Sequence, residues 1–182
     1  MELLNKDKRD GYVYDPIIKQ YDTTFWKTTT GAPAMSGSVL RFTSAGVASY
    51  LQHIFADVEF SLNVPTTPSA GEAKQWGLRN PSGDNLGAAY FEITGAVFQV
   101  VTVDDGGTSQ TTAVVWSAYE AAATEYRILW DPDRVVFYVN GTIVATHTTR
   151  VPSNALSLRI LNSDADNTDL SYVAIRRAAS II

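Results

Sequence analysis

Short runs in which apolar and polar residues alternate follow one another along most of the chain. The clearest run is 57–64, where Val58, Phe60, Leu62 and Val64 alternate with polar side chains. Successive side chains of a β-strand point to opposite faces, so this run predicts a half-buried strand. About a dozen such runs occur without the pattern of a long helix, which predicts a sandwich or barrel built from strands.

Turn sequences separate the predicted strands. The strongest is Asn140-Gly141, because a type I′ hairpin turn needs positive φ at both central residues. Residues 117–123 are predicted to form one or two helical turns. The other predicted strands are 38–43, 47–51, 74–79, 88–94, 97–103, 111–116, 126–130, 135–139, 142–148, 156–161 and 170–176.

Composition limits the partners of this chain. Its 182 residues, 45% hydrophobic and 18% charged, suit one domain with a substantial core. The formal net charge of -5 disfavours phosphate backbones, so no nucleic-acid partner is expected. The absence of cysteine excludes disulfides and thiolate metal sites. No apolar run approaches the roughly 18 residues that span a bilayer, and the charged N-terminus predicts no secretory signal, so no membrane insertion is expected.

The first residues differ from the rest and predict two parts, an extended arm at 1–22 and a sandwich domain at 23–182. The arm begins with alternating charges and continues through a turn-rich segment. Its apolar and aromatic side chains are typical of anchors in a subunit interface. We expect the arm to contact other copies of the chain, with docking on its own domain as the alternative. The expected anchors are Leu3, Leu4, Tyr12, Tyr14, Ile17 and Tyr21.

The segment 125–141 contains Tyr126-x-Ile128-x-Trp130, a short Asp/Pro turn and a Phe137-Tyr138-Val-Asn-Gly hairpin. This order resembles the concanavalin A-like lectin and glucanase superfamily, including family 16 glycoside hydrolases and laminin-G-like domains. The resemblance covers roughly 120–177 and implies an all-β fold, a two-sheet antiparallel jelly-roll sandwich. The predicted core residues are Val58, Phe60, Leu62, Phe91, Ile93, Tyr126, Ile128, Trp130, Phe137 and Val139.

The resemblance also implies a catalytic pattern that this chain lacks. Family 16 enzymes carry Glu-x-Asp-x-x-Glu on one strand, which supplies the nucleophile and the acid/base of a retaining mechanism. No such pattern occurs here. The run 88–94 has only Glu92, and the acids Asp57 and Glu59 are expected on a solvated edge face. One carboxylate cannot fill both roles, so we predict no catalytic residues and no enzyme activity.

One sheet face is the candidate binding site. Tyr90 and Glu92 are expected to point away from Phe91, and Gln75 and Arg79 away from Trp76. Aromatic rings stack on sugars, and charged or amide groups bind hydroxyls. A sugar groove lined by Arg79, Tyr90, Glu92, Arg127 and Tyr138 is one hypothesis, and a face covered by a neighbouring subunit or by solvent is the other.

Histidines and acidic loops give weaker signals. His53 and His147 lie far apart, without a nucleophile motif, and are expected to be structural or surface residues. The loop 164–169 carries three Asp residues but lacks the Gly and Glu of an EF-hand. A solvated loop is favoured here over a structural calcium. We therefore predict no cofactor and no metal ligands.

Three functional hypotheses follow. The leading one is a non-enzymatic structural protein of a virion or extracellular surface, such as a bacteriophage capsid-decoration or tail component. In this hypothesis the chain forms homo-oligomers or joins other shell proteins through its arm. The second is a carbohydrate-binding module or lectin, with glycans as partners. The third is a diverged glycan hydrolase or lyase.

Overall fold

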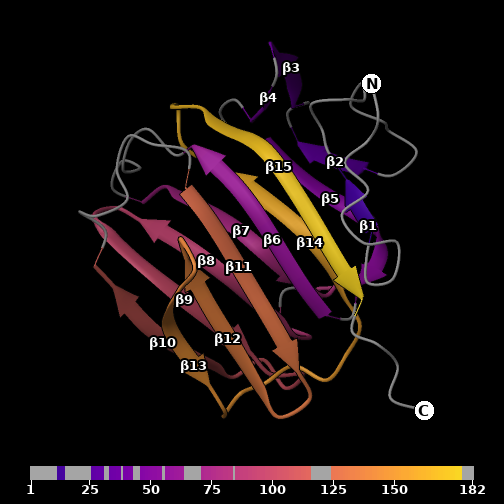
Figure 1. Cartoon of the computed structure of the whole chain (residues 1–182), viewed down its shortest axis with the longest axis vertical. Coiled ribbons are helices and arrows are strands. Elements are labelled where there is room, and N and C mark those ends of the chain that lie inside the picture. The colour runs from indigo at the N-terminus through magenta and orange to yellow at the C-terminus, as the bar shows by residue number, and fades with distance from the viewer. Residues whose placement is uncertain are drawn as a thin grey trace.

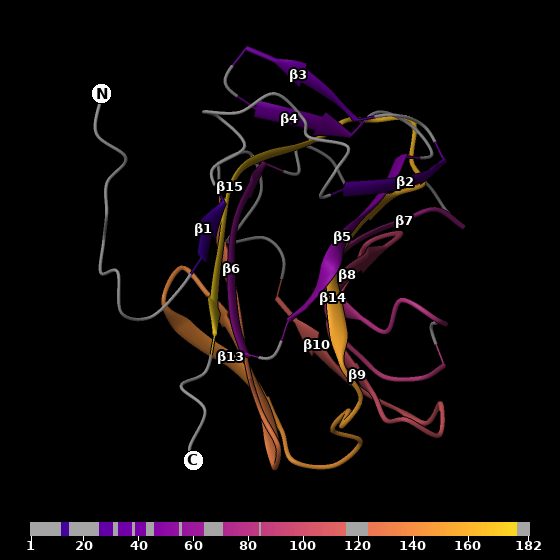
Figure 2. The ribbon, with the colours of Figure 1, turned by 90° about the vertical axis from the view of Figure 1, so that its right-hand side faces the viewer.

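Two antiparallel β-sheets pack face to face in the computed structural model (Figures 1 and 2). The structure describes residues 12–14, 26–30, 33–37, 39–42, 46–54, 56–63, 71–83, 85–115 and 124–177. Within these residues every regular element is a strand, and no helix is long and apolar enough to cross a membrane. The all-β, two-sheet sandwich predicted from the sequence is confirmed.

The strands are β1 Tyr12–Tyr14, β2 Trp26–Thr30, β3 Ala34–Ser36, β4 Val39–Phe42, β5 Gly46–Ile54, β6 Ala56–Asn63, β7 Ala73–Arg79, β8 Ala88–Thr94, β9 Val97–Val103, β10 Ser109–Val114, β11 Thr124–Asp131, β12 Arg134–Val139, β13 Thr142–His147, β14 Leu156–Asn162 and β15 Thr168–Arg177. The eight-stranded sheet runs β13-β12-β11-β6-β15-β4-β3, with β1 paired to β15. The seven-stranded sheet runs β10-β9-β8-β7-β14-β5-β2. In the side view of Figure 2, β6 and β15 lie in one layer and β5 and β14 in the other.

The predicted strands are all present between 38 and 177, with ends that differ by a few residues. The short strands β1, β2 and β3 lack a clear alternation and were not evident in the sequence pattern. Asn140 and Gly141 have φ of 48° and 75°, which confirms the type I′ turn between β12 and β13. Residues 117–123, where helical turns were predicted, lie outside the described residues.

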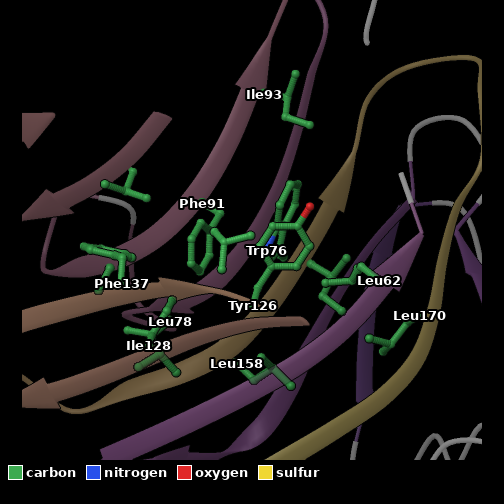
Figure 3. Close-up of a cluster of buried hydrophobic side chains, with 14 of the residues drawn as sticks. Leu62, Trp76, Leu78, Phe91, Ile93, Tyr126, Ile128, Phe137, Leu158 and Leu170 are labelled. Carbon is green, nitrogen blue, oxygen red and sulfur yellow. The ribbon is translucent and has the colours of Figure 1, made fainter. Parts of the chain in front are cut away.

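Aromatic side chains from both sheets meet in the core (Figure 3). Trp76 of β7 lies edge-on to Tyr126 of β11 with ring centroids 4.8 Å apart, and Phe91 of β8 meets Phe137 of β12 at 5.3 Å. Trp130 also donates its indole N–H to the carbonyl of Pro152 at 3.0 Å. The buried residues confirm the predicted core at Leu62, Phe91, Ile93, Tyr126, Ile128, Trp130, Phe137 and Val139. The side chains of Val58 and Phe60 lie outside the described residues.

His147 is a buried polar link between the two sheets. It ends β13, and its ring nitrogens lie 2.9 Å from the hydroxyls of Thr102 on β9 and Thr112 on β10. The ring also packs edge-on against Phe137 at 5.4 Å. Burial lowers the pKa of His147, because desolvation disfavours the charged imidazolium. This geometry fits a structural histidine, one of the two roles that the sequence predicted for it.

Two features of the eight-stranded sheet bear on the predictions for the arm and the acids. Tyr12, Val13 and Tyr14 form β1 and pair with β15 of the same chain. For these three residues the structure therefore shows docking on the chain's own domain, while Leu3, Leu4, Ile17 and Tyr21 lie outside the described residues.

The expected edge position of Asp57 and Glu59 is wrong. Their strand β6 lies between β11 and β15, inside the eight-stranded sheet. Alternation of apolar and polar residues does not report the place of a strand within its sheet.

Candidate functional site on the seven-stranded sheet

The outward side of the seven-stranded sheet carries the polar residues that the sequence singled out. Strand alternation sends Trp76, Leu78, Phe91 and Ile93 into the core and their neighbours outward. The register aligns the outward residues in rows across β14, β7, β8 and β9. We call this surface the Glu92 face; its outward residues are Ser157, Arg159, Leu161, Gln75, Gly77, Arg79, Ala88, Tyr90, Glu92, Gln99, Val101 and Val103.

Two amides hold the carboxylate of Glu92. Gln75 and Gln99 are its direct cross-strand partners on β7 and β9. The side-chain N–H groups of Gln75 and Gln99 donate to Oε1 and Oε2 of Glu92, respectively. Both carboxylate oxygens therefore accept a hydrogen bond from a neutral donor, and the side chain is fixed in one orientation.

Arg79 extends this network along β7. Its Nη2 donates to Oε1 of Gln75 at 2.6 Å, and its guanidinium carbon lies 4.1 Å from the ring centroid of Tyr90. This distance is in the range of a cation–π interaction. Arg79 is 7% exposed, whereas Gln75, Tyr90 and Glu92 are half-buried. Arg79, Gln75 and Glu92 are thus joined by hydrogen bonds into one polar network beside the ring of Tyr90.

Gly77 makes the close approach of β7 and β8 possible. A Cβ built on Gly77 would lie 2.4 Å from the carbonyl oxygen of Ala89 and 2.5 Å from the Cα of Tyr90. Both are backbone atoms, so neither can move aside at low cost. Gly77 pairs with Tyr90 on one side and Arg159 on the other, which places two large side chains around a position without one.

The other half of the Glu92 face is apolar. Ala88, Val101 and Val103 are buried and form a small cluster with Tyr90.

The Glu92 face has one carboxylate. Ala88 and Tyr90 are the preceding residues of β8 that share Glu92's face, and neither carries a carboxylate. Among all the strands of the seven-stranded sheet, Glu92 is the only Asp or Glu. A retaining glycosidase needs two carboxyl groups about 5–5.5 Å apart, and these strands supply one.

The five residues of the predicted sugar groove do not lie together. Arg79, Tyr90 and Glu92 lie on the seven-stranded sheet, whereas Arg127 and Tyr138 pair with each other in the eight-stranded sheet. Arg127 and Tyr138 alternate with the core residues Ile128 and Phe137, so they point to the opposite surface of the sandwich. The prediction of one groove from all five is therefore corrected: strand parity gives the direction of a side chain, but not the sheet to which its strand belongs.

Gln75 and Gln99 are the site residues whose role sequence reasoning missed. Both had the correct parity on predicted strands, but their meeting at Glu92 depends on the register of three strands. Register is set by turns and core packing rather than by alternation. The sequence signal for Gln75, Glu92 and Gln99 is that each is a polar residue at an outward-facing position of one of three consecutive strands.

The acidic loops are held by partners within the chain. Asp164 lies 3.4 Å from the ammonium group of the buried Lys74, and Asp169 makes a bidentate ion pair with Arg41 at 2.8 Å. The N–H of Thr108 lowers the pKa of Asp104, which also accepts hydrogen bonds from Gly106 and Arg150. Among the described residues no group of three His, Asp or Glu side chains is arranged to hold a metal ion.

The sequence pattern of glycosyl hydrolases family 16 matches residues 38–169. This match covers most of the sandwich, including every strand of the Glu92 face. The chain belongs to glycosyl hydrolases family 16. Among curated proteins nothing matches it.

Solved structures agree with the family 16 fold at low sequence identity. The catalytic domain of an endo-1,3-β-glucanase (laminarinase) from Thermotoga petrophila RKU-1 is 12% identical, with a TM-score of 0.74 over 96% of this chain and 99% of that one. The Crh5 transglycosylase in complex with NAG is 18% identical, with a TM-score of 0.72 over 97% and 90%. The Emp47p carbohydrate recognition domain is 10% identical, with a TM-score of 0.65 over 96% and 100%.

The neighbours of this family 16 chain therefore include a glucanase catalytic domain, a transglycosylase and a carbohydrate recognition domain. At these identities they establish the concanavalin A-like jelly roll and nothing finer. The choice between catalysis and recognition depends on the side chains of the Glu92 face.

Proposed function

We propose that this chain is a non-catalytic, carbohydrate-binding member of glycosyl hydrolases family 16, and that glycan binds on the Glu92 face. The observation that carries the proposal is the single carboxylate of the seven-stranded sheet, held at both oxygens by Gln75 and Gln99. Without a second carboxylate on these strands, the retaining mechanism has no nucleophile and acid pair.

The same residues suit recognition of sugar hydroxyls. A carboxylate accepts hydrogen bonds, amides both donate and accept, and an aromatic ring offers an apolar face to a sugar. Glu92, Gln75, Gln99 and Tyr90 bring these groups together on adjacent strands. Because Gly77 and the core behind β8 fix the backbone, the groups are ordered before a ligand arrives, which reduces the entropy lost on binding.

A binding experiment with two matched variants tests the proposal. Affinity electrophoresis and calorimetry with soluble β-glucans measure binding, and a reducing-end assay measures hydrolysis. We expect Glu92→Gln to weaken binding about tenfold or more, which corresponds to about 1.4 kcal/mol. Glu59→Gln, on the other sheet, changes the net charge equally and should leave binding within about twofold.

Hydrolysis separates recognition from enzyme activity. We expect no release of reducing ends by the wild-type chain or by either variant. Turnover by the wild type that disappears in Glu92→Gln would show that the chain is a glycan hydrolase. Unchanged binding in Glu92→Gln would place recognition elsewhere on the molecule.

Assembly into a virion or surface shell through residues 1–22 stays a prediction. Most of the arm lies outside the described residues, and its described part, Tyr12–Tyr14, pairs with β15 of the same chain. Deleting residues 1–20 and measuring mass in solution tests it: assembly that is unchanged by the deletion rules out the arm as the contact.

A further inference from the structure

We propose that two copies of this chain associate through strand β10, which joins their seven-stranded sheets into one continuous sheet. The two β10 strands pair antiparallel, about a two-fold axis that crosses the middle of the strand. This edge lies beyond the strands of the Glu92 face, so the association does not depend on glycan binding.

Strand β10 is the outer strand of the seven-stranded sheet (Figure 1). Within the described residues it pairs with β9 alone, from Ser109 opposite Val103 to Val114 opposite Phe98, without a shift in register. Its sequence, Ser-Gln-Thr-Thr-Ala-Val, has no charged residue and no proline. The outer N–H and C=O groups of such a strand are a template for pairing with another strand.

The other edge strands carry features that prevent such pairing. Edge strands are commonly protected by short length, by charges or by bulges. β1 and β3 have three residues each. β13 has a bulge where it pairs with Phe137 and Tyr138, and β2 has both a bulge and Lys27. Among the described edges, β10 is the one that is regular, uncharged and of ordinary strand length.

The absence of charge around β10 favours a second copy over a charged partner. No Asp, Glu, Lys or Arg occurs between Asp105 and Glu120, although the chain has a net charge of -5. Two chains of the same net charge therefore meet at this edge without placing like charges opposite each other. An acidic or basic peptide would find no opposite charge on this segment.

Exposed apolar side chains lie at one end of this edge. Val115, which follows β10, is 76% exposed, and Val97 at the start of β9 is 51% exposed. Because Val114 pairs with Phe98, the next residues along the two strands, Val115 and Val97, are neighbours. A strand that pairs along the whole of β10 covers part of Val115, which removes apolar surface from water.

Antiparallel self-pairing suits the alternation of β10. Thr111 and Ala113 are exposed on the outward side of the sheet, whereas Thr112 points inward and lies 2.9 Å from His147. Directly opposite residues of an antiparallel pair point to the same side. The registers that satisfy this condition and overlap most of β10 place Thr111 or Thr112 on the two-fold axis.

This symmetry keeps the Glu92 faces of both copies on the same side of the joined sheet. A polymeric glycan that binds both faces gains avidity, because its second contact is intramolecular. This consequence rests on the proposed function, whereas the association itself does not.

Sedimentation equilibrium of the full chain without glycan tests the association. We expect the mass to rise with concentration from 19.8 kDa toward twice that value. One strand pair buries less surface than most stable interfaces, so the dissociation constant should be about 10–100 µM.

Two matched lysine variants locate the contact. Thr111→Lys brings two like charges together near the axis and should raise the dissociation constant about tenfold or more. Thr94→Lys adds the same charge to an exposed threonine of β8, which β9 separates from the edge, and should change the constant by no more than about twofold. Circular dichroism checks the folding of each variant.

Cysteine variants report the register, because the chain has no cysteine of its own. Opposite residues of an antiparallel pair have Cβ atoms about 4.5–5.5 Å apart, which a disulfide can span after a small adjustment. Under mild oxidation, Thr111→Cys alone should form a covalent dimer if Thr111 lies on the axis. A mixture of Thr111→Cys and Ala113→Cys should do so if Thr112 lies there. The control Thr94→Cys should form none.

Three results overturn the association through β10. One is a chain that stays at 19.8 kDa up to about 500 µM. The second is a dimer that Thr111→Lys and Thr94→Lys weaken equally, and the third is the absence of a disulfide from both Thr111→Cys preparations. Each leaves the proposed glycan binding as it stands, because the measurements contain no glycan.

Discussion

The molecule carries an arginine stacked on a tyrosine on each outer surface, and the two pairs differ in their surroundings. Arg79 lies 4.1 Å from the ring of Tyr90 on the seven-stranded sheet, and Arg127 lies 5.2 Å from the ring of Tyr138 on the eight-stranded sheet. Arg79 is buried, whereas Arg127 is half-buried. The same two residue types thus make a closer, more enclosed contact on one face.

The neighbours of the two pairs decide which face is the better site. Two residues along β8 from Tyr90 is Glu92, which accepts hydrogen bonds from its cross-strand neighbours Gln75 and Gln99. Opposite Tyr138 on β13 stands Ile143, which is 58% exposed. On the seven-stranded sheet the stack is joined through Gln75 to a carboxylate that two amides hold, and this combination is a candidate for recognition.

A shared core supports both pairs, and truncating it should have the largest effect. Phe91 precedes Glu92 on β8 and Phe137 precedes Tyr138 on β12, and their rings meet at 5.3 Å. We expect Phe91→Ala and Phe137→Ala each to lower the free energy of unfolding by about 3–5 kcal/mol, because each leaves a cavity. Urea unfolding followed by tryptophan fluorescence measures this loss.

The surface residue Ile143 provides the control for the core variants. Ile143→Ala should change the free energy of unfolding by no more than about 0.5 kcal/mol, since the side chain is mostly exposed. A large loss from Ile143→Ala, or a small one from Phe91→Ala, would mean that the two faces do not share the core described here.

On the Glu92 face, Gly77 allows the backbones of β7 and β8 to approach closely. Gly77→Ala should lower the free energy of unfolding by about 1–3 kcal/mol, because the new methyl group meets backbone atoms of β8. It should also reduce glycan binding, since Tyr90 must shift. In Gly83→Ala the methyl group would meet only Leu86 side-chain atoms, at 3.7 Å or more, so stability should stay within about 0.5 kcal/mol. Equal stability of both variants would contradict the close approach of β7 and β8.

His147 makes the junction of the two sheets sensitive to pH. Its folded-state pKa is lowered by burial, so the unfolded chain takes up a proton first as pH falls. Stability is therefore fully present above the unfolded pKa, about 6.5, and decreases below it by at most about 1.4 kcal/mol per pH unit. We expect the urea midpoint to fall between about pH 7.5 and about pH 5.5.

The variant His147→Gln isolates this contribution. Glutamine can still hydrogen-bond to Thr102 or Thr112 but does not titrate, so its urea midpoint should vary less over the same pH range. His53 remains in both proteins and contributes equally to both curves. Parallel curves for the wild type and the variant would show that His147 is not the titrating group.

Sequence patterns were sufficient for the layers of this fold and insufficient for its site. Alternation identified the core faces of β8 and β11, because burial repeats every second residue over most of these strands. It also placed Tyr90 and Glu92 outward together. It wrongly joined Arg127 and Tyr138 to them, since sheet membership depends on how strands far apart in the chain pair. The Gln75–Glu92–Gln99 trio required the register of β7, β8 and β9, which no local pattern specifies.

Double-mutant cycles measure the two stacks directly. In a double-mutant cycle, the Arg79→Gln and Tyr90→Leu changes should show a coupling energy of about 2 kcal/mol, because the contact is close and largely removed from water. The cycle of Arg127→Gln and Tyr138→Leu should give about 0.5–1 kcal/mol, since its arginine is farther from the ring and more exposed. Urea unfolding of the wild type and the six variants supplies both values. A coupling on the eight-stranded sheet equal to that on the seven-stranded sheet would remove the energetic difference between the faces. The assignment of the site would then depend on the carboxylate–amide network of Glu92 alone.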